Sequence, residues 1–138
     1  MDDTIIHRIL VVDDNADIRW ILSDLLTVHG FHCEQAHDGI TALSTVVHAR
    51  FHVILTDYQM PNMDGMELLH NLTALPNTAS IPVIMITAFG DETLEVEARR
   101  AGACAVLRKP IDSRELLTVI TQAIEHTQPP FSNPCQCG

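Results

Sequence analysis

The chain has 138 residues, of which 46% are hydrophobic and 19% charged, and this composition is typical of one folded globular domain rather than of a disordered or collagenous chain. Its formal net charge of -10 would repel a phosphate backbone, so we expect no direct nucleic-acid binding. The acidic start at residues 1–4 lacks the form of a signal peptide, and no apolar stretch approaches the roughly 20 residues of a membrane span. We therefore expect a compact cytoplasmic protein without a membrane segment.

Apolar runs of strand length alternate with stretches of helical period along the chain. The first expected strand, residues 8–12, ends at an acidic pair and is followed by a helix that Gly30 closes. A second strand, residues 31–36, leads through Asp38 and Gly39 into a second helix. Apolar residues at helical spacing mark the first helix at Ile18, Ile21, Leu22 and Leu25, and the expected buried face of the second is Ile40, Leu43, Val46 and Val47.

The alternation continues through the second half of the chain. A third strand is expected over residues 51–56, and after a long loop a third helix is marked by Met66, Leu69 and Leu72 and ends before Pro76 and Asn77. The remaining expected elements are a strand at 81–86, a helix at 91–101, a strand at 103–108 and a helix at 112–126, whose inward residues are Leu116, Leu117, Ile120 and Ile124.

Strands that are almost continuously apolar, joined by crossover helices, predict a parallel sheet covered on both faces. The fold class is therefore α/β, doubly wound, with five strands. One domain is expected over residues 1–126, and the proline-containing tail at 127–138 is expected to be disordered. Within that tail, Cys135 and Cys137 are compatible with a metal site, a disulfide or no function.

Polar residues stand where the expected strands end. The acidic pair Asp13 and Asp14 follows the first strand, Asp57 the third, Thr87 the fourth, and Lys109 with Pro110 the fifth. Ligands of such sheets bind beyond the carboxyl ends of the strands, so we expect these groups to converge. Three carboxylates in one crevice repel each other unless a cation neutralises them, and oxygen ligands favour Mg²⁺.

The expected site is suited to one phosphoryl group. The chain has no glycine-rich loop to cradle a nucleotide, whereas a single transferred phosphoryl group needs only a metal ion, a cation and a hydroxyl around it. Lys109 is the one lysine in the chain, because the other seven basic residues are arginines. A compact ammonium suits a point-charge contact with a carboxylate or phosphate, so this exception falls where such chemistry requires it.

These motifs closely resemble the signature of bacterial response-regulator receiver domains over about residues 7–126. The stretches that carry the resemblance are Val11 to Asp14, Asp57 to Gly65 with its Met-Pro-Asn-Met-Asp-Gly, Ile86-Thr87-Ala88, Ala101-Gly102-Ala103, and Lys109-Pro110. The resemblance implies a flavodoxin-like (βα)5 fold with strand order 2-1-3-4-5. It also implies a phosphorylated signalling domain that is not an enzyme in the usual sense, although it assists its own phosphorylation and dephosphorylation.

The resemblance also implies roles for individual residues. Asp57 would be the phosphoacceptor, and Asp13, Asp14 and the backbone carbonyl of Gln59 would help to hold Mg²⁺, for which Mn²⁺ can substitute. Thr87 would bind a phosphoryl oxygen, and Lys109 would pair with Asp57 before transfer and with the phosphoryl group afterwards. The structural residues would be Pro110, after a cis peptide, and Asp64 with Gly65, at the start of the third helix.

Three further positions bear on signalling. Gln59 and Phe89, each two residues past an expected site residue, resemble the family's determinants of phosphoryl lifetime. The family usually carries an aromatic residue three positions before the lysine, and Val106 stands there, which puts the aromatic part of the family's switch in doubt. We expect an interaction surface for dimerisation or target binding on the fourth helix, fifth strand and fifth helix, comprising Arg99, Arg100, Arg108, Arg114 and Val106. The alternative is a solvated face on which these arginines pair with Glu95, Glu97 and Glu115.

The expected partners are a histidine kinase or histidine phosphotransfer protein upstream and a protein target or effector domain downstream. Two other interpretations remain open. In the first, the chain is a receiver cut from a larger DNA-binding regulator or hybrid kinase. In the second, it is a small phosphatase-like enzyme with an aspartyl-phosphate intermediate. The enzyme interpretation lacks an evident substrate pocket or second acid/base residue.

Overall fold

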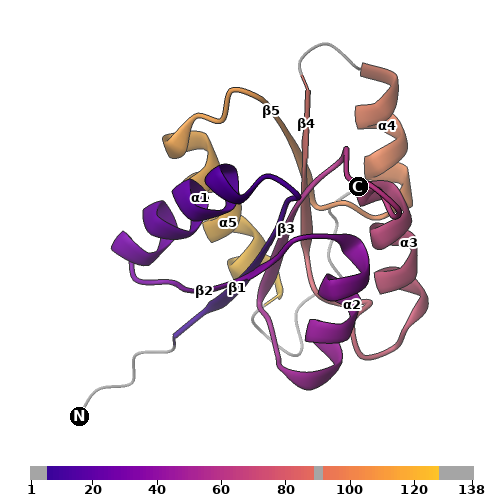
Figure 1. The fold of residues 1–138 in the computed structure, drawn as a ribbon, viewed down its shortest axis with the longest axis horizontal. Helices are drawn as coiled ribbons and strands as arrows, with labels where there is room; N and C mark the ends of the chain where they lie inside the picture. Colours follow the sequence, from indigo (N-terminus) through magenta and orange to yellow (C-terminus); the bar gives the residue numbers. More distant parts are fainter. Residues whose placement is uncertain (1–5, 89–91, 128–138) are drawn as a thin grey trace.

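The computed structural model describes residues 6–88 and 92–127, and its strands and helices alternate along the chain (Figure 1). The strands are β1 (Arg8–Val12), β2 (His32–Ala36), β3 (Val53–Asp57), β4 (Val83–Thr87) and β5 (Ala105–Arg108). The helices are α1 (Ala16–Val28), α2 (Gly39–His48), α3 (Gly65–Ala74), α4 (Glu92–Ala101) and α5 (Ser113–Thr127). The sheet is parallel, in the order β2-β1-β3-β4-β5, so the predicted fold class and strand order are confirmed.

The alternation of side chains along each strand separates the core into two layers. In β1, Leu10 and Val12 face the cluster that contains residues of α2, α3 and α4, whereas Ile9 and Val11 face the cluster that contains residues of α1 and α5. Figure 1 shows the corresponding arrangement, with α1 and α5 on one side of the sheet and α2, α3 and α4 on the other. Burial on both faces explains why the inner strands β1, β3 and β4 are largely apolar, whereas the edge strand β2 is partly exposed and mostly polar.

The buried face predicted for α2 is wrong at two positions. Ile40 and Val47 are 58% and 72% exposed, while Ala42 is fully buried and Leu43 and Val46 pack against the core. Val47 lies about 100° around the helix axis from Val46, so both cannot point at the sheet. The small side chain of Ala42 takes the inward position instead and lies in the core cluster with residues of the sheet.

Several element boundaries differ from the prediction by one or two residues. The strand predicted at 51–56 begins at Val53 and includes Asp57, so the expected phosphoacceptor is the last residue of β3 rather than the first of a loop. The first helix is also partly misjudged, because Ile21 is 63% exposed. Its end is correct: Gly30 has a φ of 94°, and the amide of Phe31 donates to Leu26 O across the turn.

In the part of the chain that the structure describes, no helix is long and apolar enough to cross a membrane. Thr127, the first residue of the predicted tail, is the last residue of α5. The rest of that tail, residues 128–138 with Cys135 and Cys137, lies outside the described ranges, as does Phe89.

Candidate functional site

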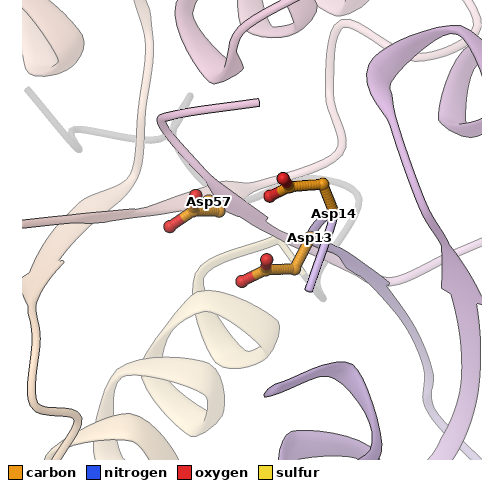
Figure 2. A group of neighbouring side chains, drawn as sticks. All are labelled: Asp13, Asp14 and Asp57. Atoms are coloured by element: carbon orange, nitrogen blue, oxygen red, sulfur yellow. The ribbon is translucent and has the colours of Figure 1, made fainter. Parts of the chain in front are cut away.

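Three carboxylates gather at the carboxyl edge of the sheet. Asp13 and Asp14 directly follow β1, and Asp57 ends the neighbouring strand β3, so parallel pairing brings them together. One oxygen from each lies within 4.8 Å of the others, and all three side chains point toward the same region (Figure 2). Asp13 and Asp57 are only 2% and 5% exposed, whereas Asp14 is exposed to solvent. The site is thus a crowded acidic pocket with one open side.

The loop after β1 holds Asp13 through its backbone and its carboxylate. The amide of Asp13 donates to Ala36 O at 3.2 Å, and the amide of Asn15 donates to Asp13 Oδ1 at 2.9 Å. Asn15 in turn caps α1, because its side-chain oxygen accepts the amide of Ile18 at 3.1 Å. The direction of the Asp13 carboxylate is therefore coupled to the start of α1.

Lys109 supplies the positive charge of the pocket. Its Nζ lies 2.8 Å from Asp57 Oδ1, and its amide donates to Thr87 O at 2.9 Å, directly after β5. The peptide between Lys109 and Pro110 is cis. An ammonium at this distance partly neutralises the charge of Asp57. The carboxylate on the solvent-exposed side of the pocket is that of Asp14.

The pKa values of the pocket residues reflect this crowding. Desolvation raises the pKa of Asp57, and Asp14 adds to this, although the hydrogen bond and the charge of Lys109 oppose it. Desolvation likewise raises the pKa of Asp13, with repulsion from Asp57 and Asp14 in the same direction. Desolvation would lower the pKa of Lys109, but its contacts with the carboxylates outweigh that effect and raise it. The ionised carboxylates of this pocket are therefore stabilised by a nearby cation.

The loop between β3 and α3 closes one wall of the site. The amide of Gly65 donates to Tyr58 O at 2.7 Å, and a Cβ on Gly65 would come 2.5 Å from the carbonyl oxygen of Asp57. Asp64 and Glu67 form a capping box at the start of α3, as expected for Asp64. Only glycine therefore fits where α3 begins against the end of β3.

The pocket opens into a hollow of about 760 Å³. The residues that line it are Asp13, Asp14, Asn15, Ile18, Asp57, Tyr58, Gln59, Met60, Pro61, Asp64 and Lys109. Gln59 thus lies at the hollow, and its backbone amide hydrogen bonds to the Asp57 carboxylate. Thr87 ends β4 but is 2% exposed and is not among the lining residues, and Val106 is 7% exposed within the core.

The donor set of the pocket suits a hard divalent cation. The three ligand atoms that lie together are all carboxylate oxygens, which Mg²⁺ prefers, and Asp14 is open to solvent, where the ion keeps its waters. Such an ion would also relieve the repulsion among Asp13, Asp14 and Asp57. The acidic cluster is therefore consistent with the metal site of a receiver domain.

Comparison with known proteins identifies the family. A family model described as the response regulator receiver domain matches residues 9–121. The chain belongs to this family. The resemblance inferred from the motifs is thereby confirmed, and the chain is a two-component signalling phospho-acceptor rather than a classical enzyme, with an acidic pocket typical of phospho-accepting response regulators. Membership also implies a kinase partner.

Similar proteins include short and long relatives. The receiver is 35% identical over 119 residues to the chemotaxis protein CheY-3 of Vibrio cholerae, which covers 86% of this chain and 92% of that protein. It is 36% identical to the transcriptional regulatory protein FixJ of Rhizobium meliloti, over 91% of this chain but 59% of that protein. It is also 36% identical to the regulatory protein AtoC of Escherichia coli, over 88% of this chain and 26% of that protein. The chain thus spans less than two thirds of each of these two longer regulators.

Solved structures agree with the fold. The crystal structure of FixJ-N superposes with a TM-score of 0.82 at 35% sequence identity, covering 89% of this receiver and 97% of that chain. The chemotaxis protein CheY4 of Vibrio cholerae gives a TM-score of 0.81 at 31% identity, covering 86% of this receiver and 99% of that chain.

The arginines of the expected interaction surface fall into two groups. Glu95 on α4 pairs with Arg99 at 3.6 Å and with Arg108 on β5 at 2.9 Å, so part of the solvated alternative is present. Arg100 and Arg114 are exposed, and neither forms an ion pair within the described ranges. Arg100 and Arg114 are therefore the arginines of this face that remain available to a partner.

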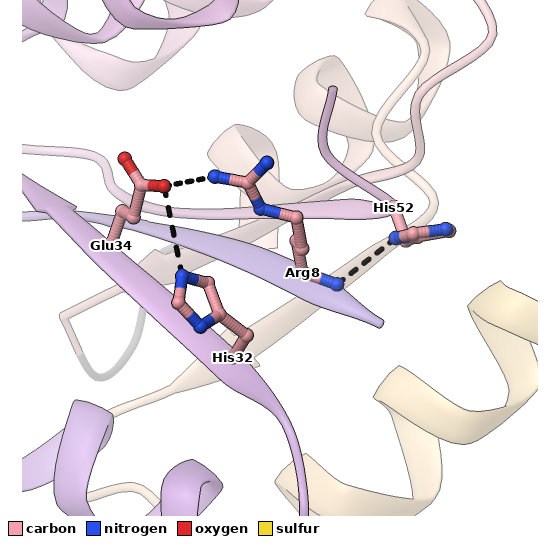
Figure 3. A network of polar contacts seen from close by, with 4 residues as sticks. All are labelled: Arg8, His32, Glu34 and His52. Atoms are coloured by element: carbon pink, nitrogen blue, oxygen red, sulfur yellow. Dashed lines mark hydrogen bonds and ion pairs between the residues drawn. The ribbon is translucent and has the colours of Figure 1, made fainter. Parts of the chain in front are cut away.

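A second polar cluster lies at the opposite edge of the sheet (Figure 3). The amide of Arg8 donates to His52 Nδ1 at 3.0 Å, and the amide of His52 donates to Arg8 O at 2.8 Å, so this histidine links the starts of β1 and β3. The guanidinium of Arg8 pairs with Glu34, from which His32 Nε2 lies 3.8 Å. The rings of His7 and His52 meet edge to face at 4.9 Å.

The sequence predicted the acidic residues and the lysine of the site, but it did not predict the roles of Arg19 and Gln35. Arg19 on α1 donates to the carbonyl oxygen of Asp13 at 2.7 Å and to Gln35 Oε1 on β2 at 3.1 Å. Neither residue belongs to a motif at the end of a strand. Arg19 did carry one signal, because a cation in the first turn of a helix opposes the helix dipole.

Proposed function

We propose that this protein is a phosphorylation-dependent response-regulator receiver that accepts a phosphoryl group on Asp57 from a phosphohistidine of a histidine kinase or phosphotransfer protein. The observation that carries the proposal is the contact of 2.8 Å between Lys109 Nζ and Asp57 Oδ1, at the mouth of a pocket shared with Asp13 and Asp14. Asp57 is thus held at the hollow, where a donor can reach it.

In the proposed reaction, a carboxylate oxygen of Asp57 attacks phosphorus while the bond from phosphorus to the donor imidazole breaks, leaving an acyl phosphate on Asp57 and a neutral imidazole after protonation. Asp13, Asp14, Asp57 and the Gln59 carbonyl would hold Mg²⁺ or Mn²⁺, which supplies charge neutralisation for two anionic reactants. Lys109 orients Asp57 beforehand and pairs with the phosphoryl oxygens afterwards.

The proposed output lies on α4, β5 and α5. Thr87 is buried at the end of β4, and its hydroxyl would engage a phosphoryl oxygen and draw the following loop toward the site. A surface for dimerisation or target binding that comprises Arg99, Arg100, Arg108, Arg114 and the buried Val106 would then favour one of two arrangements. The Glu95–Arg108 pair joins α4 to β5, so a shift of α4 relative to β5 would change this contact.

Similarity to longer regulators supports a wider context. Because FixJ and AtoC extend well beyond the matched region, a receiver cut from a larger DNA-binding regulator or hybrid kinase is the second candidate, in which the same surface would contact an effector domain. A histidine kinase forms its phosphohistidine from ATP, so the proposed function implies a cytoplasmic location.

Labelling with a small phosphodonor tests the acceptor. Wild-type protein incubated with acetyl phosphate and Mg²⁺ should gain one phosphoryl mass, and Asp57→Asn should gain none, because an amide is a poor nucleophile. Asp17→Asn, which removes the same charge from an exposed position on α1, should label normally. Equal labelling of Asp57→Asn would refute the assignment.

Removal of the metal tests the second part of the proposal. Excess chelator should abolish labelling, and added Mg²⁺ or Mn²⁺ should restore it, because attack of a carboxylate on an anionic phosphoryl group requires charge neutralisation. Transfer at full rate in chelator would contradict the proposed metal site.

The proposed surface is tested by amide chemical shifts recorded with and without beryllofluoride as a phosphoryl mimic. Shift changes are expected to extend from the pocket into residues 92–115. Changes confined to the loops of the pocket would show that this face is not the switch surface.

A further inference from the structure

Arg19 lies where a positive side chain opposes the helix dipole. It is the fourth residue of α1, and cations in the first turn face the positive end of the dipole. Its guanidinium is nevertheless half-buried and makes two directed hydrogen bonds, from Nη1 to Asp13 O at 2.7 Å and from Nε to Gln35 Oε1 at 3.1 Å. One side chain therefore joins α1, the loop after β1, and β2.

The carbonyl that Arg19 contacts belongs to the peptide between Asp13 and Asp14. A peptide unit is planar, so fixing its carbonyl oxygen fixes the direction in which the chain continues into Asp14. The other polar groups of Asp13 are held by backbone partners: its amide by Ala36 O and its carboxylate by the amide of Asn15. Within the part of the chain that the structure describes, the Asp13 carbonyl oxygen is thus the group of this residue that accepts a hydrogen bond from a side chain, that of Arg19.

Gln35 holds the other edge of the guanidinium in place. It is the penultimate residue of β2 and is aligned with Val11 of β1, so its backbone cannot shift without disturbing the sheet. A planar guanidinium can bond to two acceptors in fixed directions, whereas an ammonium on a flexible stem acts as a point charge. Two anchors therefore define both the position and the orientation of the Arg19 side chain.

We propose that Arg19, held by Gln35, is a positioning residue for the divalent cation: it fixes the Asp13–Asp14 peptide so that both carboxylates face the ion. The inference rests on the proposed metal-dependent function. Outer partners that orient metal ligands typically change metal affinity by about 10–100-fold when they are removed.

The sign of the effect separates positioning from simple charge. Arg19 is positive, so a purely electrostatic influence on the pocket would repel Mg²⁺, and its removal would tighten binding. Positioning predicts the opposite result. A purely structural role predicts lower stability with unchanged affinity.

Isothermal titration of metal-free protein with MgCl₂, at fixed ionic strength and well below the unfolding temperature, measures the effect. Arg19→Met, which keeps the apolar stem, should weaken Mg²⁺ binding by roughly tenfold or more. Gln35→Leu should weaken it less, because the bond to Asp13 remains. Arg19→Lys should fall between the wild type and Arg19→Met. Arg50→Met, which removes one exposed positive charge from the far edge of the sheet, should bind like the wild type.

Thermal unfolding of each variant in chelator provides the companion measurement. The proposal is overturned if Arg19→Met binds Mg²⁺ as tightly as the wild type, or more tightly, whatever its stability. If Arg19→Met does not fold, Arg19→Lys and Gln35→Leu decide in the same way. Failure of wild-type protein to bind Mg²⁺ would instead refute the proposed function, so the two failures are distinguishable.

Discussion

Replacement of Asp13 by Asn is expected to stabilise the metal-free receiver while weakening its response to Mg²⁺. Asp13 is 2% exposed, and one of its carboxylate oxygens lies within 4.8 Å of a carboxylate oxygen of Asp14 and of Asp57. Its negative charge is therefore repelled by two like charges. The Asn side chain has nearly the same shape, and its amide oxygen can still accept the amide of Asn15, as Oδ1 of Asp13 does at 2.9 Å. The substitution therefore removes charge with little change in packing.

The magnitude follows from the geometry. Two like charges 4.8 Å apart repel by about 3.5 kcal/mol at an effective dielectric constant of about 20. Two effects reduce the net penalty at Asp13: Asp14 is exposed and therefore screened, and Lys109 attracts the carboxylate. We expect Asp13→Asn to raise the free energy of unfolding in chelator by about 1–3 kcal/mol, the remainder after these offsets.

Metal should reverse the order of stability. At a free Mg²⁺ concentration of 100 times the dissociation constant, binding adds about 2.7 kcal/mol to the wild type, whereas Asp13→Asn has lost a ligand and gains less. Plots of unfolding free energy against Mg²⁺ concentration should therefore cross. Urea unfolding in chelator and in graded Mg²⁺ measures both curves. Asp17→Asn serves as the control, since it removes an equal charge outside the pocket.

The result that would refute this reasoning is an Asp13→Asn variant less stable than the wild type in chelator at neutral pH. The pH dependence provides an internal check. Burial raises the pKa of Asp13 in the folded state, so the ionised carboxylate costs stability above that pKa, and the cost disappears as the pH falls through it. The advantage of Asp13→Asn should therefore shrink in acid.

Three further outcomes are expected. Gly65→Ala should destabilise the fold by about 1–3 kcal/mol and slow labelling by acetyl phosphate, because its Cβ would lie 2.5 Å from the carbonyl oxygen of Asp57; a variant with wild-type stability and labelling would contradict this. Lys109→Met should raise the pKa of Asp57 further and reduce labelling at neutral pH, which mass spectrometry across a pH series can follow; unchanged labelling would argue against its role. Burial and the nearby His7, Arg8 and Arg50 lower the pKa of His52 in the folded state. The contribution of neutral His52 to the free energy of unfolding should therefore be fully present above about pH 6.5 and be lost as the pH falls through the lowered pKa. His52→Asn should remove this pH dependence in urea titrations.

The sequence alone was sufficient for the fold class because burial on both faces makes the inner strands β1, β3 and β4 largely apolar and places the acidic residues of the site at their ends, although the edge strand β2 is polar along most of its length. Asp13, Asp14 and Lys109 were identifiable for that reason. Helix faces were less predictable. Ile40 has the helical spacing of a buried residue, but contact with the sheet is made through Ala42, and which residue of a helix points inward depends on how closely that helix approaches. That distance is set by packing between elements.

The basic residues show most clearly what the three-dimensional arrangement adds. In the sequence, Arg99, Arg100, Arg108 and Arg114 form one group because they are close along the chain, and Arg19 stands apart from them. In the structure, Glu95 engages Arg99 and Arg108, while Arg19 contacts the backbone of the acidic pocket 2.7 Å away. Pairing with Glu95 ties β5 to α4, so a partner that binds this face must either use the remaining arginines or compete for that carboxylate. Glu95→Gln distinguishes these cases: it should strengthen binding of an acidic partner if Arg108 is the contact, and leave it unchanged if Arg100 or Arg114 is.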